Sequence, residues 1–377
     1  MHLSPLSRYI LTTLLIFSGA VSSVLANSLT DDVMRYTALK LEQANVEQTI
    51  WTGPTDGPTL INSKTVLLIA SDLRDGGVNA VTQGLIEALR HTDWQLTIFD
   101  GSGSSIKQKS AVQKAIMAKP DAIVFAGVDL TPYPRILNVA RNEGITLVGW
   151  HASNENIYSS STVTTQLLFT NIASDSASTG ELAALFAIRQ TLGNAKVVIV
   201  TDSSLSNAQL KVEGIQDAFS MCPACKILSI ADISLDNTTS IAHELSRVLE
   251  DYGQLATHIV ATSDLYFDYA TPIIEDYRQR YNVAPITITA GEGSSSSAVR
   301  IRDHQFQVAS VAEPLNLQGW QLVDELNRAF NNQEPSGFSA PVRLLTHENI
   351  NSVENPTLTY DPNNDYRVEY LKIWEPK

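Results

Sequence analysis

Short runs rich in Val, Ile and Leu alternate with longer amphipathic stretches along most of the chain after Lys64. Most short runs lack the in–out alternation of a half-exposed strand, so they predict strands that are covered on both faces. The longer stretches place apolar residues at helical spacing. Strands and helices that alternate in this way predict an α/β fold with doubly wound parallel sheets.

The alternation divides into two similar units with a break near residue 170. Strands of the first unit are predicted at Val66–Ala70, Gln95–Phe99, Ala122–Phe125 and Thr146–Gly149, with helices near 78–90, 106–118 and 132–142. Those of the second are predicted at Leu167–Asn171, Lys196–Thr201, Ile227–Ala231, His258–Ala261, Ile286–Ala290, Gln307–Ala312 and Pro341–Thr346. Helices of the second unit are expected near 176–191, 205–220, 238–250, 266–280, 294–302 and 315–330. The polar segment Ser153–Gln166 has no apolar period and interrupts the rhythm.

Two different segments precede the first unit. Residues 31–50 predict an amphipathic helix with Val33, Tyr36, Leu39, Val46 and Ile50 on one face, and Trp51–Pro58 then forms an irregular connector with two Gly-Pro pairs.

The first 26 residues have the pattern of a signal peptide, with Arg8, the apolar run Ile10–Phe17 and small residues at Val24 and Ala26. We expect cleavage before Asn27 and export of the mature chain. An uncleaved anchor is the alternative, but the apolar run is short for a bilayer span of about 20 residues.

The formal net charge is −14, with 26 Lys and Arg against 40 Asp and Glu. A nucleic-acid-binding protein needs a basic surface, so this charge argues against that class, and it also disfavours anionic membrane surfaces. The composition, 44% hydrophobic and 18% charged residues, is that of a folded protein.

The only two cysteines form the motif Cys222-Pro-Ala-Cys225. A thioredoxin-like pair follows a strand and begins a helix, whereas this pair follows a helical pattern and precedes a strand. We therefore expect a structural disulfide rather than a redox site, and no metal site, because no paired His accompanies the cysteines.

Ligands of open α/β sheets bind beyond the carboxyl ends of the strands, and nearly every such loop here carries a carboxylate or a hydroxyl. Carboxylates accept strong hydrogen bonds from sugar hydroxyls, and Trp150 could pack on a sugar ring. The alternative is that these residues are turn formers and helix N-caps. Gly101 and Gly103 read as a turn rather than a dinucleotide fingerprint. No P-loop or nucleophile elbow is present, and we expect no catalytic residue and no cofactor.

Several segments, in this order and spacing, resemble the type I periplasmic solute-binding proteins, in particular the ribose-binding-protein-like group of sugar ABC transporters. The markers are Thr65–Ser71, Lys119–Phe125, Asn142–Val148, Asn171 with Gly180, and Lys211–Ile215; Trp51–Pro58 and Val311–Trp320 are similar to a sugar-binding subgroup. The resemblance covers roughly residues 64–346. It implies two doubly wound parallel-sheet lobes joined by three crossovers, placed here near 170, 313 and 342.

The expected division is a signal peptide (1–26), an N-terminal helix and connector (27–63), lobe 1 (64–170 plus 314–341) and lobe 2 (171–313 plus 342–377). Carried over position by position, the resemblance implies that the ligand-binding residues are Ser71, Arg74, Asp75, Gly77, Asp129, Trp150, His151, Gln209, Asp264, Glu292 and Glu313. Ribose binders have Asp-Arg where this chain has Trp150-His151, and almost every other specificity position differs. Ribose itself is therefore not implied.

The leading functional hypothesis is a monomeric periplasmic protein that clamps a sugar or polyol between two lobes and delivers it to an inner-membrane ABC permease. The alternative is a receptor that presents its ligand to a chemoreceptor or sensor kinase. An enzyme on the same scaffold is disfavoured because no nucleophile–base spacing is legible. A repressor is excluded because an export signal stands where such proteins carry a helix-turn-helix.

Overall fold

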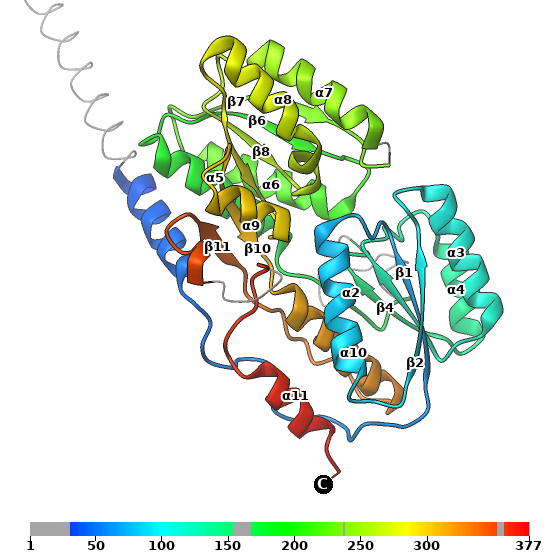
Figure 1. The fold of residues 1–377 in the computed structure, drawn as a ribbon. Helices are drawn as coiled ribbons and strands as arrows, with labels where there is room; N and C mark the ends of the chain where they lie inside the picture. The colour runs from blue at the N-terminus through cyan, green and yellow to red at the C-terminus, as the bar shows by residue number, and fades with distance from the viewer. Residues whose placement is uncertain (1–30, 154–166, 237, 353–357, 377) are drawn as a thin grey trace, which may run out of the picture.

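The computed structural model describes residues 31–153, 167–236, 238–352 and 358–376. The predicted signal peptide and all but the first residue of Ser153–Gln166 lie outside the described residues. The described chain forms two sheets, each with helices on both faces, and Figure 1 shows the two layered units one above the other. We call the unit built on the five-stranded sheet the first lobe and the unit built on the six-stranded sheet the second lobe.

The first lobe has an all-parallel sheet of order β2-β1-β3-β4-β5. Its strands are β1 (Thr65–Ala70), β2 (Gln95–Asp100), β3 (Ala122–Ala126), β4 (Thr146–Trp150) and β5 (Thr170–Ile172). Its helices are α2 (Gly76–Leu89), α3 (Ser105–Ala118), α4 (Pro134–Asn142) and α10 (Leu315–Phe330). Apolar residues of β1, β3 and β4 are buried on both faces, in one cluster with α2 and α10 and in another with α3 and α4.

The second lobe has the sheet order β11-β10-β9-β8-β6-β7, with only β11 antiparallel to its neighbour. Its strands are β6 (Lys196–Thr201), β7 (Lys226–Asp232), β8 (His258–Ala261), β9 (Ile286–Thr289), β10 (Gln307–Ala312) and β11 (Arg343–Thr346). Its helices are α5 (Ser176–Gln190), α6 (Ser206–Ser220), α7 (Thr238–Tyr252), α8 (Leu265–Tyr281) and α9 (Ser295–Arg302), followed by the short helix η1 (Ile350–Ser352).

These elements confirm the predicted fold class, and most lie within two residues of their predicted bounds. The continuous apolar runs predicted strands well because both faces of each sheet are covered by helices. The predicted strand Leu167–Asn171 is the least accurate: only its last two residues belong to β5, which begins at Thr170.

The N-terminal helix occupies residues 31–45 and packs on the second lobe, where Leu41 is buried beside α5. Tyr36 and Lys40 both bond to Glu181 of α5. The predicted apolar face is partly wrong, because Leu39, Val46 and Ile50 are exposed. The helix ends before Val46, and the face that packs on the lobe carries Val33, Thr37, Leu41 and Ala44 at helical spacing instead.

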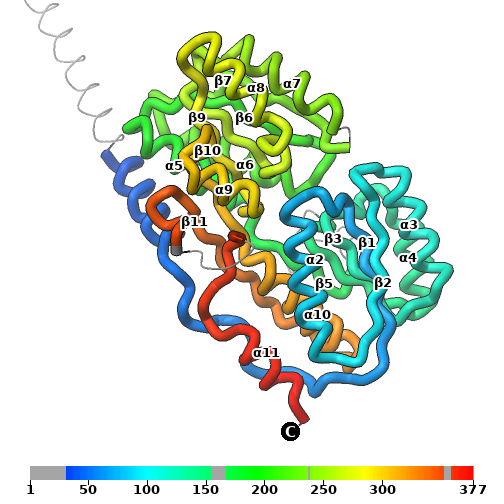
Figure 2. Tube along the Cα trace, in the orientation of Figure 1, coloured from blue at the N-terminus to red at the C-terminus, as the bar shows by residue number. Residues whose placement is uncertain are grey.

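The connector that follows crosses to the first lobe, as the blue tube in Figure 2 shows. Trp51 contacts Phe338 and Tyr370, and the side chains of Asn327 and Arg328 on α10 donate to the backbone oxygens of Pro58 and Asp56.

The C-terminal helix α11 (Tyr366–Trp374) also lies in the first lobe. Trp374 stacks on Trp320 of α10 at 5.7 Å between ring centroids. The predicted division placed all of 342–377 in lobe 2. The structure differs because β11, η1, Leu358 and Tyr360 pack there, whereas α11 packs on the first lobe. Two connections between the lobes, 46–50 and the segment that leads into α11, therefore add to the three predicted crossovers.

Close helix pairs stabilise both lobes. Gly84 of α2 faces Asn316 and Gly319 of α10, and a Cβ on Gly84 would lie 2.5 Å from the Asn316 carbonyl oxygen. In the second lobe a Cβ on Gly180 of α5 would lie 2.0 Å from the Lys211 carbonyl oxygen, so only glycine allows α5 and α6 to approach this closely. Gly180 and Lys211 belong to the segments that carried the family resemblance.

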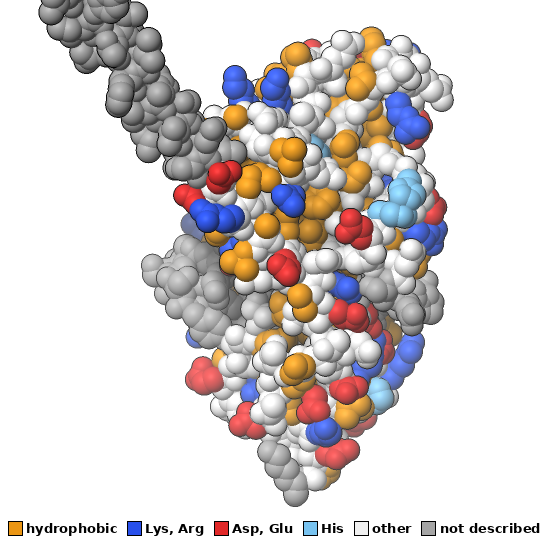
Figure 3. All heavy atoms as spheres, turned by 90° about the vertical axis from the view of Figure 1, so that its left-hand side faces the viewer, with side chains coloured by type: hydrophobic (Ala, Val, Ile, Leu, Met, Phe, Trp, Pro, Cys, Tyr) orange, Lys and Arg blue, Asp and Glu red, His pale blue; other side chains and the backbone are white. Residues whose placement is uncertain are grey.

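Three further observations bear on the sequence-based predictions. Cys222 and Cys225 form a disulfide at the turn between α6 and β7. No helix among the described residues is long and apolar enough to cross a membrane. On the outer face shown in Figure 3, acidic and basic side chains are mixed, with hydrophobic side chains between them.

We predict that Trp374→Ala lowers the free energy of unfolding by about 3–5 kcal/mol, because it removes a buried indole that stacks on Trp320 and donates to Asp324 at 2.9 Å. The control is Val368→Ala on the exposed face of the same helix, which should change stability by no more than about 0.5 kcal/mol. Chemical denaturation measures both. Equally small losses of stability in both variants would show that α11 is not part of the hydrophobic core of the first lobe.

Candidate functional site

A cavity of about 280 Å³ lies between the lobes, where the carboxyl ends of the two sheets face each other. The first lobe lines it with segments that follow β1, β2, β3 and β4. The second lobe lines it with segments that follow β6, β7, β8 and β9, including the first turn of α6. This is the position at which open α/β sheets bind ligands, and here two such edges share one space.

Asp75 is the N-cap of α2 and lines the cavity. Its Oδ1 accepts hydrogen bonds from the backbone N–H groups of Gly77 (2.8 Å) and Val78 (3.1 Å). Burial, together with the nearby Glu292 carboxylate of the second lobe, raises the pKa of Asp75 to about 7. Gly77 faces Glu292 so closely that a Cβ would lie 2.9 Å from the Glu292 side chain, which explains a glycine at this point.

Trp150 ends β4 and gives the cavity its large aromatic ring. Its Nε1 donates to Gln318 Oε1 of α10 at 2.7 Å, and the His151 ring stands edge-on to it at 4.4 Å between centroids. These two contacts fix the indole, so its orientation is set before any ligand arrives.

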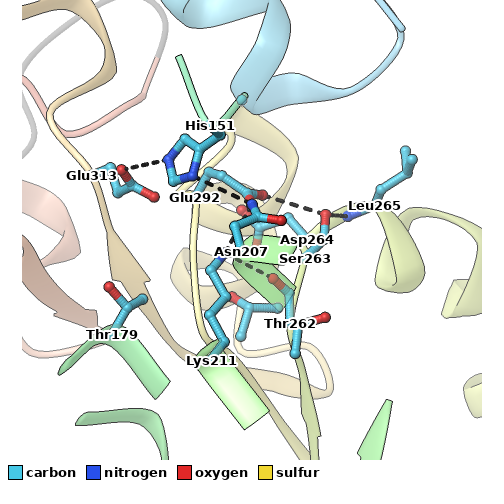
Figure 4. Close-up of polar contacts among 12 residues, drawn as sticks. His151, Thr179, Asn207, Lys211, Thr262, Ser263, Asp264, Leu265, Glu292 and Glu313 are labelled. Carbon is cyan, nitrogen blue, oxygen red and sulfur yellow. Dashed lines mark hydrogen bonds and ion pairs between the residues drawn. The ribbon is translucent and has the colours of Figure 1, made fainter. Parts of the chain in front are cut away.

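Two polar contacts join the lobes across the cavity. Asp129, in the loop after β3, accepts from the backbone N–H of Ser206 at 3.1 Å and from its hydroxyl. Ser206 is the first residue of α6, where exposed N–H groups and the helix dipole favour a carboxylate. His151 Nδ1 lies 3.3 Å from the Asn207 amide nitrogen, as Figure 4 shows. The described conformation is therefore a closed one.

The buried carboxylate of Glu313 connects the crossovers. Its Oε2 lies 3.0 Å from His151 Nε2 and accepts from Ser174 N (3.3 Å) and Gln318 Nε2 (3.0 Å). Ser174 in turn donates to the Ala340 carbonyl at 3.1 Å. Burial alone would raise the pKa of Glu313, but the His151 imidazole, the nearby Lys211 ammonium and the Gln318 amide hold it well below its usual value.

A second buried ion pair lies beside the cavity. Lys211 of α6 reaches Glu292 Oε1 at 3.0 Å and donates to the Thr262 carbonyl at 2.9 Å (Figure 4). Burial would lower the pKa of Lys211, but the Glu292 and Glu313 carboxylates outweigh it, so the pKa is raised and the ammonium stays charged. The remaining oxygen of Glu292 accepts from Ser263 at 3.3 Å.

The family model of the periplasmic binding protein domain matches residues 66–334. The chain belongs to this family. The match confirms the resemblance seen in the sequence, and it places the chain among binding proteins rather than enzymes, as expected. No match was found among curated proteins.

Solved structures show the same type I fold as this periplasmic binding protein. One is an ABC transporter solute-binding protein from Agrobacterium vitis with bound allitol (17% identity, TM-score 0.65, covering 78% of this chain and 98% of that one). Another is GanP, a glucose-galactose binding protein from Geobacillus stearothermophilus (17%, TM-score 0.65, 76% and 99%). A third, from Bacillus halodurans C-125, holds myo-inositol (16%, TM-score 0.64, 79% and 99%).

The cavity brings together part of the ligand-binding set inferred from the resemblance. The residues of that set that line it are Ser71, Asp75, Asp129, Trp150, His151 and Glu292. Their use by a ligand stays a prediction, because several of them already bond to protein atoms.

The other inferred residues point elsewhere in this periplasmic binding protein. Arg74 is largely exposed and pairs with Asp72 at 2.6 Å, and Gln209 donates to the Ser203 carbonyl. Asp264 accepts from the backbone N–H groups of Gly293 and Ser294. Glu313 belongs to the crossover network. Gly77 contributes space for Glu292 rather than a lining side chain.

Sequence reasoning missed several lining residues, among them Tyr133, Asn207 and Asp236. Asn207 lies in the first turn of α6, the helix that follows β6. A search of the loops after each strand would have found Asn207 if it had included the first turn of the following helix. Lys211 lies in one of the segments that carry the family resemblance, but no sequence pattern indicates its ion pair with Glu292.

We predict that Asn207→Ala weakens ligand binding whereas Gln209→Ala does not. Both are amides on the first turns of α6, but only Asn207 lines the cavity and contacts His151. The loss expected for one hydrogen bond is about 0.5–1.5 kcal/mol, or roughly two- to tenfold in Kd. Titration calorimetry with any ligand that stabilises the protein measures it. Equal losses in both variants would contradict the site.

We also predict that Glu313→Ala lowers the free energy of unfolding by about 3 kcal/mol or more, because His151, Ser174 and Gln318 lose a buried acceptor. Glu143→Ala is the control, since Glu143 pairs with Lys119 on the surface, where an ion pair contributes little. Thermal and chemical denaturation of both variants test this. A Glu313→Ala protein as stable as wild type would contradict the role of the network.

Proposed function

We propose that this protein is a periplasmic solute-binding protein that clamps a small sugar-like ligand between its two lobes and delivers it to an ABC permease. The observation that carries the proposal is the closed cavity itself. It joins the ligand-binding edges of two α/β sheets, and it combines a fixed indole with carboxylates, hydroxyls and an amide.

This lining suits a polyhydroxylated ring or chain. The carboxylates of Asp75, Asp129 and Asp202 can accept hydrogen bonds from hydroxyl groups, and charge-assisted bonds of this kind are stronger than neutral ones. Trp150 offers an apolar face to C–H groups. Neighbouring structures with allitol and myo-inositol are consistent with a ligand of this size and class.

Closure supplies the mechanism. The residues that line the cavity come from both lobes, so a ligand contacts its full set of partners only when the lobes are together. Such a ligand shifts the open–closed equilibrium by the difference between its affinities for the two states. The closed surface, with both lobes in one arrangement, is what we propose the permease recognises. Export through the N-terminal signal peptide would place the protein, as a monomer, in the periplasm.

We predict that sugars or polyols raise the melting temperature of the chain that begins at Asn27. A ligand that binds only the native state adds about 2.7 kcal/mol of apparent stability at a hundredfold excess over Kd. A thermal-shift panel of D-ribose, D-glucose, D-galactose, sorbitol and myo-inositol with amine analogues measures it. No shift with any sugar, polyol or amine-bearing analogue would contradict the proposal.

A further inference from the structure

Among the described residues, the cavity between the lobes is lined by six acidic side chains and by His151, and by no Lys or Arg. The acidic lining residues are Asp72, Asp75, Asp129, Asp202, Asp236 and Glu292. On the outer face of Figure 3, by contrast, acidic and basic side chains are mixed. The negative charge in the cavity is therefore a local feature of the site.

Only two of these carboxylates have a basic partner among the described residues. Arg74 pairs with Asp72 at 2.6 Å, and Lys211 pairs with Glu292 at 3.0 Å. None of the ion pairs of the described chain includes Asp75, Asp129, Asp202 or Asp236.

Three of the unpaired carboxylates are held by neutral donors instead. Asp129 accepts from Thr131 and Ser206, and Asp202 accepts from Ser204 and Leu235. Asp75 accepts only at Oδ1, from Gly77 and Val78, and no hydrogen bond from another described residue reaches its Oδ2. Such donors orient a carboxylate and stabilise its ionised form, but they bring no full positive charge into the cavity.

The carboxylates that line the cavity repel one another. A neutral sugar does not change this repulsion, whereas a cationic ligand reduces it. The aromatic rings fit either ligand, because Trp150 and Tyr133 also line the cavity and aromatic faces attract cations. An anionic ligand would be repelled by the acidic lining residues, and Arg74 lies outside the cavity and cannot offset them.

We propose that the natural ligand carries a protonated amine in addition to its hydroxyls, as an amino sugar or an amine-bearing polyol does, and that its ammonium group binds beside Asp75. This inference rests on the proposed function and specifies the ligand class of the same cavity.

The pKa of Asp75 gives such a ligand a measurable consequence. The charged groups that act on it are Glu292 and Asp264 from the second lobe, with Lys211 paired to Glu292. Burial and Glu292 bring its pKa to about 7, so near neutral pH a large fraction is protonated in the empty protein. An ammonium group beside it favours the ionised form, and binding therefore releases a proton.

The pH dependence of stability follows with a definite sign. Because burial raises the folded pKa of Asp75 from the ordinary value of 3.8 to about 7, its contribution favours the empty folded state at low pH and is lost as pH rises from 3.8 to about 7. A bound cation cancels this loss, and stabilisation by an amine ligand should therefore grow between pH 5 and pH 7, where the amine stays protonated.

The experiment compares matched probes on the mature protein. Titration calorimetry uses 1-amino-1-deoxy-D-sorbitol against sorbitol, and D-glucosamine against D-glucose and N-acetyl-D-glucosamine, in two buffers of different ionisation enthalpy. We expect the amines to bind about tenfold or more tightly than their neutral partners. We also expect an apparent enthalpy that depends on the buffer for the amines alone.

Two charge-matched variants locate the effect. Asp75→Asn should remove most of the preference for the amine and the release of the proton. Asp217→Asn removes the same charge from the exposed face of α6 and should leave both unchanged. Retention of the preference in Asp75→Asn would overturn the assignment to Asp75.

The outcomes separate the two proposals. Neutral probes that bind as tightly as the amines, or more tightly, would overturn the amine inference and leave the solute-binding function standing. Failure of both probe classes across the sugar and polyol panel would overturn the proposed function and the amine inference together.

Discussion

The arrangement of the two lobes depends on one buried carboxylate. Glu313 lies at the crossover between β10 and α10, and it accepts from Ser174 at the first crossover and from Gln318 at the start of α10. Its contact with His151 extends this network to the cavity, where the same ring meets Asn207 of the second lobe. A ligand that contacts His151 therefore touches a group that is bonded both to the crossovers and to the opposite lobe. Through these contacts of His151, ligand binding is coupled to closure of the two lobes.

The second lobe contributes a matching constraint through its helix pair. The approach of α5 and α6 at Gly180 and Gly214 sets the position of α6 over the sheet. That position brings Lys211 to Glu292 and places Ser206 and Asn207 at the cavity edge. A side chain at either glycine would push α6 outward and move three functional groups at once. The positions of the side chains at the cavity therefore depend on the packing of α5 against α6.

Sequence reasoning predicted what local pattern determines. The strands could be predicted from continuous apolar runs because helices cover both faces of each sheet. The helix bounds followed from apolar periodicity. The sequence did not indicate the orientation of the side chains. Arg74, Gln209 and Glu313 occupy positions that the resemblance marks as ligand contacts, yet their side chains bond to Asp72, Ser203 and the crossover network. A shared fold fixes the backbone position of a motif residue. The direction of its side chain depends also on neighbours that are far away in the sequence. The same limit explains α11, whose place beside Trp320 no local pattern indicates.

We propose that ligand occupies the cavity between the lobes and holds them together. Small-angle X-ray scattering of the mature protein, with and without a saturating amount of the probe that binds most tightly, tests this most directly. We expect the radius of gyration to fall when that probe is added, and the scattering of the bound protein to match the closed arrangement of the lobes. A probe that binds tightly while the radius of gyration stays unchanged or rises would show that ligand does not hold the lobes together.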